Sequence, residues 1–421
     1  MPHPIPLPRL NHVFMRIGLA SFGGPAAQIA LLHRSLVSEE RWLSEQEFLR
    51  ALSFCMVLPG PEAMQLAAYT GWRLRGVWGG VIAGLWFVGP GAAVILGLAL
   101  IYTEFEEIPI VHGMLIGMQA CVIAIVCQAL IRLSQRALTD RQTRGIAVSS
   151  FVGLYVFGVP FPVIIAAAMI FGALRMNPTP NQDMSRAHRQ IGLRRLWRNA
   201  FPWALAWLLP LVALLATSSL YGQLAGLFSQ LSALSFGGAY ALLAWMSQAM
   251  VEMHGWLTPK QMIDALGLAE TTPGPLVLVT AFTGFLVGHD AGGVWGGLLG
   301  WLIAIWMTFV PCFLWVFTGA PVLENLTTHP RINAALRAVT AAIVGVIANL
   351  SVWFALHVLF AGVTPGPFAL QVPQINTLSL PVAAVVLASI YALIQRKLPF
   401  WVVLCAAAVC GGGMAICNLI E

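Results

Sequence analysis

The chain has 421 residues, of which 59% are hydrophobic and only 9% are charged, whereas soluble domains carry roughly 25% charged residues. This composition, with a mean hydropathy of +0.82, excludes a soluble globular protein. The net charge of +6 comes almost entirely from arginines in a few loops. Such arginines are typical of residues that set membrane topology and do not indicate a nucleic-acid surface.

Apolar segments follow one another along most of the chain. The proline-rich start at 1–10 has no small-residue cleavage site after it, so no secretory signal peptide is predicted. Long apolar runs at 76–102, 112–133, 201–220 and 294–317 each reach the about 20 residues that cross a hydrocarbon core. The sequence predicts an all-α polytopic protein embedded in a lipid bilayer.

The chain contains an internal duplication. An S-F-G-G motif at 21–24 recurs 214 residues later at 235–238, and a P-G-P motif at 59–61 recurs with the same offset at 273–275. A shared offset between separate motifs is the mark of a repeat. We therefore predict two homologous halves.

Beyond the P-G-P motifs the repeat shifts by three residues. A W-G-G motif at 78–80 pairs with the one at 295–297. We expect the extra residues in a loop that holds His289 and Asp290.

The predicted organisation has four parts. The N-terminal repeat covers 10–175, and a basic cytoplasmic linker with an N-P-T-P turn covers 176–198. A single connecting transmembrane helix covers 199–220, and the C-terminal repeat covers 221–421.

Loop charges predict that the two repeats have inverted topology. The linker and the arginine-rich loop at 132–144 belong to the cytoplasmic side, and G-V-P-F-P at 158–162 divides the next segment into two short helices. In the second half Arg331 marks an inside loop, whereas the loop at 362–377 has no basic residue. The arrangement is six, one and six, or about 13 segments, with the motif segments either crossing the bilayer or re-entrant.

The S-F-G-G and P-G-P motifs interrupt hydrophobic segments, because proline removes a backbone donor and clashes with the preceding turn. Broken backbone at membrane depth must be buried or line a wet cavity. In transporters such breaks turn helix N-termini towards anions. Four related breaks predict one central anion site lined by free N–H groups; the alternative is that these residues only permit kinks and close packing.

Several polar residues near the breaks are further candidates. Arg16 lies about two turns before the first break and is expected either to pair with the anion or to extend to the interface. Glu62 and Glu270 each lie beside a break and are candidates for proton coupling. Glu62 is equally well suited to stabilising a helix N-terminus. Gln65 and Tyr69 share one helical face beyond the first P-G-P motif.

The predicted substrate-binding set joins the breaks to these polar residues. It comprises Arg16, Gly23, Gly24, Pro25, Gln28, Pro59, Gly60, Pro61, Gln65, Tyr69, Gly237, Gly238, Thr271, Thr272, Pro273, Gly274 and Pro275. The Thr271 and Thr272 hydroxyls are expected either to bind substrate or to cap the next helix.

Motifs for other chemistry are missing from the sequence. There is no G-x-x-x-x-G-K-[ST] loop, H-E-x-x-H, G-x-S-x-G or Cys/His zinc spacing. We therefore predict a protein that is not an enzyme, with no catalytic residue, cofactor or metal site. Transport must be driven by an ion gradient, the membrane potential or a partner.

At these motifs the sequence resembles the chromate transporter family in its long, two-domain bacterial form. The resemblance rests on residues 21–25, 58–62, 236–240 and 270–275 among others and covers nearly the whole chain. It implies inverted halves and export of chromate, a tetrahedral dianion like sulfate, across the bacterial inner membrane, which gives chromate resistance. Two residues depart from the family pattern, in which histidine is common at Gln28 and glutamine at Ala281.

The sequence is consistent with three functions. The first is chromate export, and the second is transport of another oxyanion such as sulfate or molybdate. The third is a passive anion channel or a membrane-embedded enzyme, although paired catalytic groups are missing. The expected partners are the oxyanion and the lipid bilayer, with no nucleic acid, and a homodimer is left open.

Overall fold

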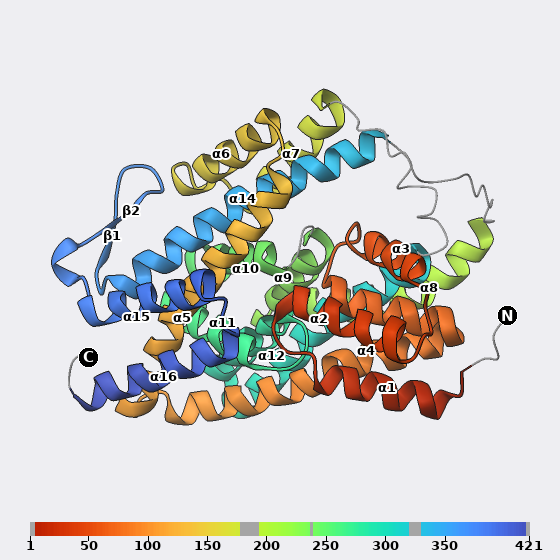
Figure 1. Cartoon of the computed structure of the whole chain (residues 1–421), viewed down its shortest axis with the longest axis horizontal. Coiled ribbons are helices and arrows are strands. Elements are labelled where there is room, and N and C mark those ends of the chain that lie inside the picture. Colours follow the sequence, from red (N-terminus) through yellow and green to blue (C-terminus); the bar gives the residue numbers. More distant parts are fainter. Residues whose placement is uncertain (1–4, 177–192, 236–238, 320–329, 418–421) are drawn as a thin grey trace. The chain divides into compact units, whose positions relative to one another are not determined.

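The computed structural model describes residues 5–176, 193–235, 239–319 and 330–417. Almost all of the secondary structure in these ranges is helical, and their single sheet is a two-stranded antiparallel hairpin (Figure 1). The elements are α1 (Leu7–Leu19), α2 (Gly24–His33), the π-helix η1 (Arg34–Glu39), α3 (Glu45–Cys55), α4 (Glu62–Phe105), α5 (Pro109–Ala137), α6 (Arg141–Tyr155), α7 (Phe161–Arg175), α8 (Leu193–Leu215), α9 (Leu220–Leu234), α10 (Ala239–Ser247), the π-helix η2 (Gln248–Met253), α11 (Pro259–Thr271), η3 (Leu276–Leu278), α12 (Val279–Gly319), α14 (Pro330–Leu359), β1 (Val363–Pro365), β2 (Gln371–Pro373), η4 (Ile375–Thr377), α15 (Leu380–Ile390), η5 (Tyr391–Gln395) and α16 (Phe400–Ile416).

Local sequence explains where several helices begin. Ser44 accepts from the Glu47 amide in a capping box at the start of α3, and Asp140 caps α6 through Thr143 in the same way. Pro109 opens α5, where its missing N–H is no loss. Helix boundaries therefore follow the residue chemistry at these places.

The apolar helices account for the membrane character. Within the described ranges five helices are long and apolar enough to cross a bilayer, which makes the chain a multi-pass membrane protein. α4 and the η3–α12 stretch each have 44 residues, which is about twice the length that a single crossing needs. Each therefore contains more than one helix.

Both long stretches fold back on themselves as helical hairpins. In α4 the turn falls at Arg75 and Gly76, whose φ/ψ angles are −142°/24° and 65°/−158°. In α12 it falls at Gly292 and Gly293, with −154°/27° and 61°/−156°. The two turns have the same backbone conformation 217 residues apart, so the duplication seen in the motifs extends to the backbone and keeps the three-residue shift.

Glycines hold the two arms of each hairpin together. A Cβ added at Gly71 would meet the backbone of Gly79, and one added at Gly288 would meet the backbone of Gly296. Small residues let membrane helices approach closely enough for backbone contact. These four positions explain why both hairpins need glycine on both sides of the turn.

Two sequence expectations about element boundaries are wrong. The connecting helix was expected to reach residue 220, but α8 ends at Leu215, because Ser218 has a positive φ of 48° and Ser219 caps α9. His289 and Asp290 were expected in a loop, yet both lie in the helical arm before the turn of α12. The two short helices expected around 158–162 are confirmed as α6 and α7.

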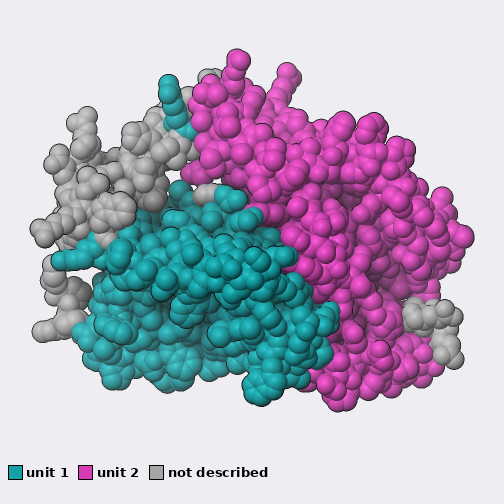
Figure 2. All heavy atoms as spheres, turned by 180° about the vertical axis from the view of Figure 1, so that it is seen from behind, with its two compact units in different colours: residues 1–99, 178–242, 269–333 teal, residues 100–177, 243–268, 334–421 magenta. Residues whose placement is uncertain are grey.

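The chain divides into two compact units (Figure 2). Unit 1 comprises residues 1–99, 178–242 and 269–333, and unit 2 comprises residues 100–177, 243–268 and 334–421. Each unit takes helices from both sequence repeats. In unit 1 the long helix α12 packs against α8 and α9, and in unit 2 α5 packs against α15 and α16.

Candidate functional site

The signature motifs of the two repeats meet inside unit 1. The Gly274 N–H donates to both the carbonyl oxygen and the Oγ of Ser21, each at 2.9 Å. The Gly60 N–H donates to the carbonyl oxygen of Ser235 at 3.2 Å. Each P-G-P motif is therefore hydrogen-bonded to the serine of the other repeat's S-F-G-G motif, and we call this cluster the motif junction.

Only glycine fits the centre of the P-G-P motifs. Gly60 has φ of +112° and Gly274 has φ of +93°, a region that residues with a Cβ avoid. A Cβ on Gly60 would lie 2.8 Å from Gln65 Nε2 and 2.9 Å from Cys312 Sγ. Both the backbone conformation and the packing at position 60 therefore require glycine.

Gln28 joins the two sides of the junction. Its Nε2 donates to the Gly274 carbonyl at 2.5 Å and to the Ser21 carbonyl at 3.3 Å. The side chain is only 1% exposed, so these bonds satisfy polar groups that water does not reach. The residue that departs from the family pattern thus lies at the centre of the junction.

Gln65 lies beside the break of the first repeat, as its position on the helix predicted. Its side chain is fully buried and its Nε2 donates to the Pro59 carbonyl at 2.6 Å. Its Oε1 has no hydrogen-bond partner among the described residues, which makes it a place for water or a ligand O–H group. Tyr69 instead packs in an aromatic cluster, 5.3 Å from the Phe54 ring and 5.9 Å from the Trp72 ring.

The expectation of free N–H groups at every break needs correction. The Gly60 and Gly274 amides are already paired with serines, because a buried amide without a partner is unstable. The start of α2 is different: Gly23 is its N-cap in a left-handed conformation, and no side chain caps the helix. Space beyond Gly24 is open, since an added Cβ would have no neighbour within 4 Å.

The start of α2 is thus the described break that presents an uncapped helix N-terminus together with open space. Pro25 lies in its first turn, where proline is well tolerated. The corresponding glycines of the second repeat, Gly237 and Gly238, lie outside the described residues.

Arg16 does not join the junction. Its guanidinium makes a 2.8 Å ion pair with Glu39, and its side chain is 54% exposed. Its charge is therefore balanced at the surface of unit 1, and we leave it out of the site. In unit 2, Arg337 pairs with Asp140 at 2.9 Å.

The two acidic candidates have different environments. Glu62 is half-buried in the first turn of α4, where a carboxylate favours the helix N-terminus. Glu270 is only 5% exposed, and its Oε1 accepts a 3.0 Å hydrogen bond from the Tyr240 hydroxyl. Glu270 is thus a deeply buried carboxyl next to the second P-G-P motif.

The two threonines at the end of α11 have different environments. The Thr272 hydroxyl donates to the Ala269 carbonyl at 2.8 Å, so its proton already serves the last turn of α11. Thr271 is exposed. Pro59, Pro61, Pro273 and Pro275 are all buried around the junction.

Sequence reasoning missed several residues of the junction. Ser21 and Ser235 were recognised only as members of the S-F-G-G motifs. Their backbone carbonyl oxygens accept hydrogen bonds from the P-G-P glycine of the opposite repeat. Cys312 next to Gly60 and Tyr240 beside Glu270 were also missed as site residues. The repeat offset was the one signal available, because it brings both serines and both glycines into equivalent positions.

The junction offers backbone dipoles and uncharged donors, with no metal ligand set. No group of three or more His, Cys, Asp or Glu side chains able to hold a metal occurs in the described ranges. An arrangement of this kind suits reversible binding of a small polar solute without covalent chemistry. Interrupted helices of this kind are typical of membrane transport proteins.

Comparison with known proteins identifies the family. The family model described as "Chromate transporter" matches the chain twice, at residues 9–173 and 222–412, so the chain belongs to the chromate transporter family. The double match also confirms the duplication.

Three curated relatives resemble most of the chain. It is 33% identical to the chromate transport protein of Pseudomonas aeruginosa over 98% of this chain and 93% of that protein. It is 31% identical to a probable chromate transport protein of Synechococcus elongatus, over 82% and 83% of the two chains. It is 28% identical to the chromate transport protein of Cupriavidus metallidurans, over 81% of this chain and 80% of that protein. No solved structure matches the chain significantly.

Proposed function

We propose that this protein is a secondary transporter of the bacterial inner membrane that exports chromate, driven by an ion gradient or the membrane potential. Membership of the chromate transporter family carries this proposal. The uncapped start of α2 beside the motif junction supports it, because a helix N-terminus with open space attracts anions. The proposed substrate site comprises Gly23, Gly24 and Pro25 at this end, together with Gln28 and Gln65.

Glu270 is the proposed proton-carrying group. It is buried beside a break and has the Tyr240 hydroxyl as a partner. Intramembrane carboxyls of this kind mark ion pathways. Uptake by a Glu270→Gln variant is expected to lose its response to an imposed proton gradient while Tyr240 still has an oxygen to donate to.

Transport of another oxyanion, sulfate or molybdate, is the second candidate. Gln28 favours it, because an uncharged amide replaces the histidine common in the family at the centre of the junction. Backbone N–H groups recognise shape and charge and discriminate poorly among tetrahedral anions. Competition between these anions separates the two candidates.

Everted membrane vesicles test the proposal. Vesicles that contain the protein should accumulate labelled chromate when energised, whereas accumulation of labelled sulfate or molybdate in preference to chromate is expected under the second candidate. Vesicles with Gly97→Ala serve as the matched control, because an added Cβ at Gly97 meets nothing within 4 Å. Uptake no greater than in vesicles without the protein would refute chromate export.

We also propose that the repeats are inverted and supply about 13 membrane segments in a six, one and six arrangement. Contacts within unit 2 support this. Asp140 before α6 pairs with Arg337 near the start of α14, and the Ala369 N–H beyond α14 donates to the Val156 carbonyl beyond α6. α6 and α14 therefore run in the same direction. Reporter tags at 140, 185 and 370 test the topology, and all three on one side would contradict it.

A further inference from the structure

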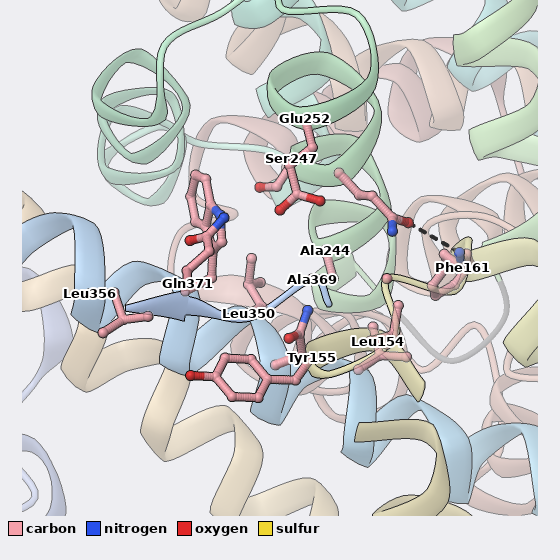
Figure 3. Close-up of a pocket in the computed structure, with 15 residues that line it drawn as sticks. Leu154, Tyr155, Phe161, Ala244, Ser247, Glu252, Leu350, Leu356, Ala369 and Gln371 are labelled. Atoms are coloured by element: carbon pink, nitrogen blue, oxygen red, sulfur yellow. Dashed lines mark hydrogen bonds between the residues drawn. The ribbon is translucent and has the colours of Figure 1, made fainter. Parts of the chain in front are cut away.

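Unit 2 contains a pocket that the chromate proposal does not use. It is open to solvent, with about 650 Å³ of empty space when that solvent is included, and it lies where the α6–α7 turn, the α10–η2 segment, α14 and the β1–β2 hairpin come together (Figure 3). Its polar lining comes from Tyr155, Ser247, Gln248, Glu252, Asn349, Trp353 and Gln371. We call it the Glu252 pocket.

Unpaired polar atoms gather in this pocket. Ser247 Oγ and Gln371 Oε1 line it, and both are buried side-chain oxygen atoms without a hydrogen-bond partner among the described residues. Ser247 is 4% exposed. A buried polar atom that stays unpaired destabilises a fold, because it has lost its hydrogen bonds to water. Their concentration around one space indicates an occupant that pairs with them.

The charge of the lining residues indicates whether the bound ligand is a cation or an anion. Glu252 is the only charged residue that lines the pocket in the described part of the chain, and no lysine, arginine or histidine does. Figure 3 shows Glu252 and Ser247 pointing into the space that Gln371 borders from another side. A carboxylate without a basic partner repels anions and attracts cations. The Glu252 pocket is therefore a site for a cation and not for the oxyanion.

The ligand atoms define the class of cation. The carboxylate of Glu252, the hydroxyl of Ser247 and the amide oxygen of Gln371 are hard oxygen ligands, which suit alkali and alkaline-earth ions. A single carboxylate balances a single positive charge. We propose that the Glu252 pocket binds one hydrated monovalent metal cation, with Na⁺ as the ion to test. The Trp353 indole N–H faces the Glu252 carboxyl as a hydrogen-bond donor and helps to orient it.

The surrounding fold keeps the ligands in place. Gln248 Oε1 accepts from the Phe161 backbone N–H at 3.1 Å, which ties the α10–η2 segment to the start of α7. The Ala369 N–H donates to the Val156 carbonyl at 2.9 Å, which ties the β1–β2 hairpin to the same turn. Ser247 and Gln371 therefore come from segments that these two hydrogen bonds, one from a side chain and one between backbones, attach to the same α6–α7 turn.

Direct binding of ²²Na⁺ to the purified full-length protein in detergent tests the site, with choline chloride holding the ionic strength constant. The wild type is expected to bind one ion per chain saturably. Glu252→Gln should weaken binding at least tenfold, and Ser247→Ala should weaken it less. Glu107→Gln is the matched control, because Glu107 is an exposed acid that does not line the pocket, and it should bind like the wild type.

Two binding results would contradict the cation site. Absence of saturable binding to the wild type, or equal binding by Glu252→Gln, overturns the proposal. Thermal melting of each variant in choline chloride controls for folding. The conservative Gln371→Glu variant keeps an oxygen at the pocket and should still bind, which a mere loss of folding would not allow.

A transport assay then tests whether this cation drives export, a step that rests on the proposed function. Chromate uptake by energised vesicles should rise with an imposed Na⁺ gradient for the wild type and not for Glu252→Gln. If the wild type binds Na⁺ but moves no chromate, the proposed function fails and the cation site stands. If chromate moves and no Na⁺ binds, the cation site fails alone.

Discussion

At the scale of single residues, glycines and glutamines carry the motif junction. Gly60 and Gly274 adopt backbone angles that side chains disfavour, and their amides reach serines of the opposite repeat. Gln28 and Gln65 then donate to carbonyl oxygens that the helix breaks leave unpaired. The junction is thus held by uncharged hydrogen bonds.

Gly60→Ala is expected to disrupt the junction. The new Cβ meets Gln65 Nε2 and Cys312 Sγ, and the left-handed backbone becomes strained, a change of about 1–3 kcal/mol in stability. We expect a lower melting temperature and loss of chromate tolerance in a sensitive host. Gly97→Ala should leave both unchanged, and a Gly60→Ala protein with wild-type tolerance would contradict the assignment.

Gln28→Leu tests the bridge across the junction. The substitution keeps the volume but leaves the Ser21 and Gly274 carbonyls without the amide donor, which we expect to destabilise the fold by about 1–3 kcal/mol. Gln28→His restores a donor and should recover part of the stability. Thermal melting of the three proteins measures the effect, and equal melting temperatures would show that the bridge is dispensable.

At the scale of elements, the ends of the helices decide how the segments connect. Ser44 and Asp140 begin α3 and α6 with capping boxes, whereas the start of α2 has no cap. Glycine pairs such as Gly71 with Gly79 close the helical hairpins. Helices such as α1, α5 and α7 also lack a side-chain cap, so the start of α2 differs from them only in lying at a signature break beside open space.

Asp140 makes a pH-dependent contribution to stability. Hydrogen bonds from Thr143 lower the pKa of its carboxyl most strongly, and Arg337 adds to the shift. Because the folded pKa lies below the unfolded value, this stability is present above the unfolded pKa and is lost as pH falls through the folded one. Asp140→Ala should cost about 1 kcal/mol at neutral pH and little in acid. The measurement is a series of melting curves between about pH 3 and 7, which covers the titration of the carboxyl group. Asp140→Asn is the control, because asparagine keeps the helix cap.

At the scale of the whole molecule, the two repeats are interlocked and do not form separate domains. Unit 1 holds residues from both repeats, and reciprocal bonds join Ser21 to Gly274 and Ser235 to Gly60. A half-chain would leave these partners missing. The duplication therefore places residues of both repeats side by side within unit 1.

A chain divided within residues 177–192 tests this interlocking. Each half expressed alone is expected to be degraded, because its P-G-P amide lacks the opposite serine. Co-expression of both halves should restore a complex that can be purified through a tag on either one. Stable accumulation of a single half, at the level of the intact chain, would contradict the prediction.

The sequence by itself determined the membrane location, the duplication and the places where helices break. These are local properties: apolar length, proline and glycine act on the backbone within a few residues. The family resemblance rested on the same motifs, and the family match confirmed it.

Only the tertiary structure decided which residues meet. Ser21 and Gly274 are 253 residues apart, Arg16 found its partner in Glu39, and the Glu252 pocket draws its lining from four separate segments. The S-F-G-G and P-G-P motifs predicted walls of an anion site with free amides, yet the fold used two of those amides to join the repeats. Pairing depends on which groups become buried together, and a linear pattern does not specify that.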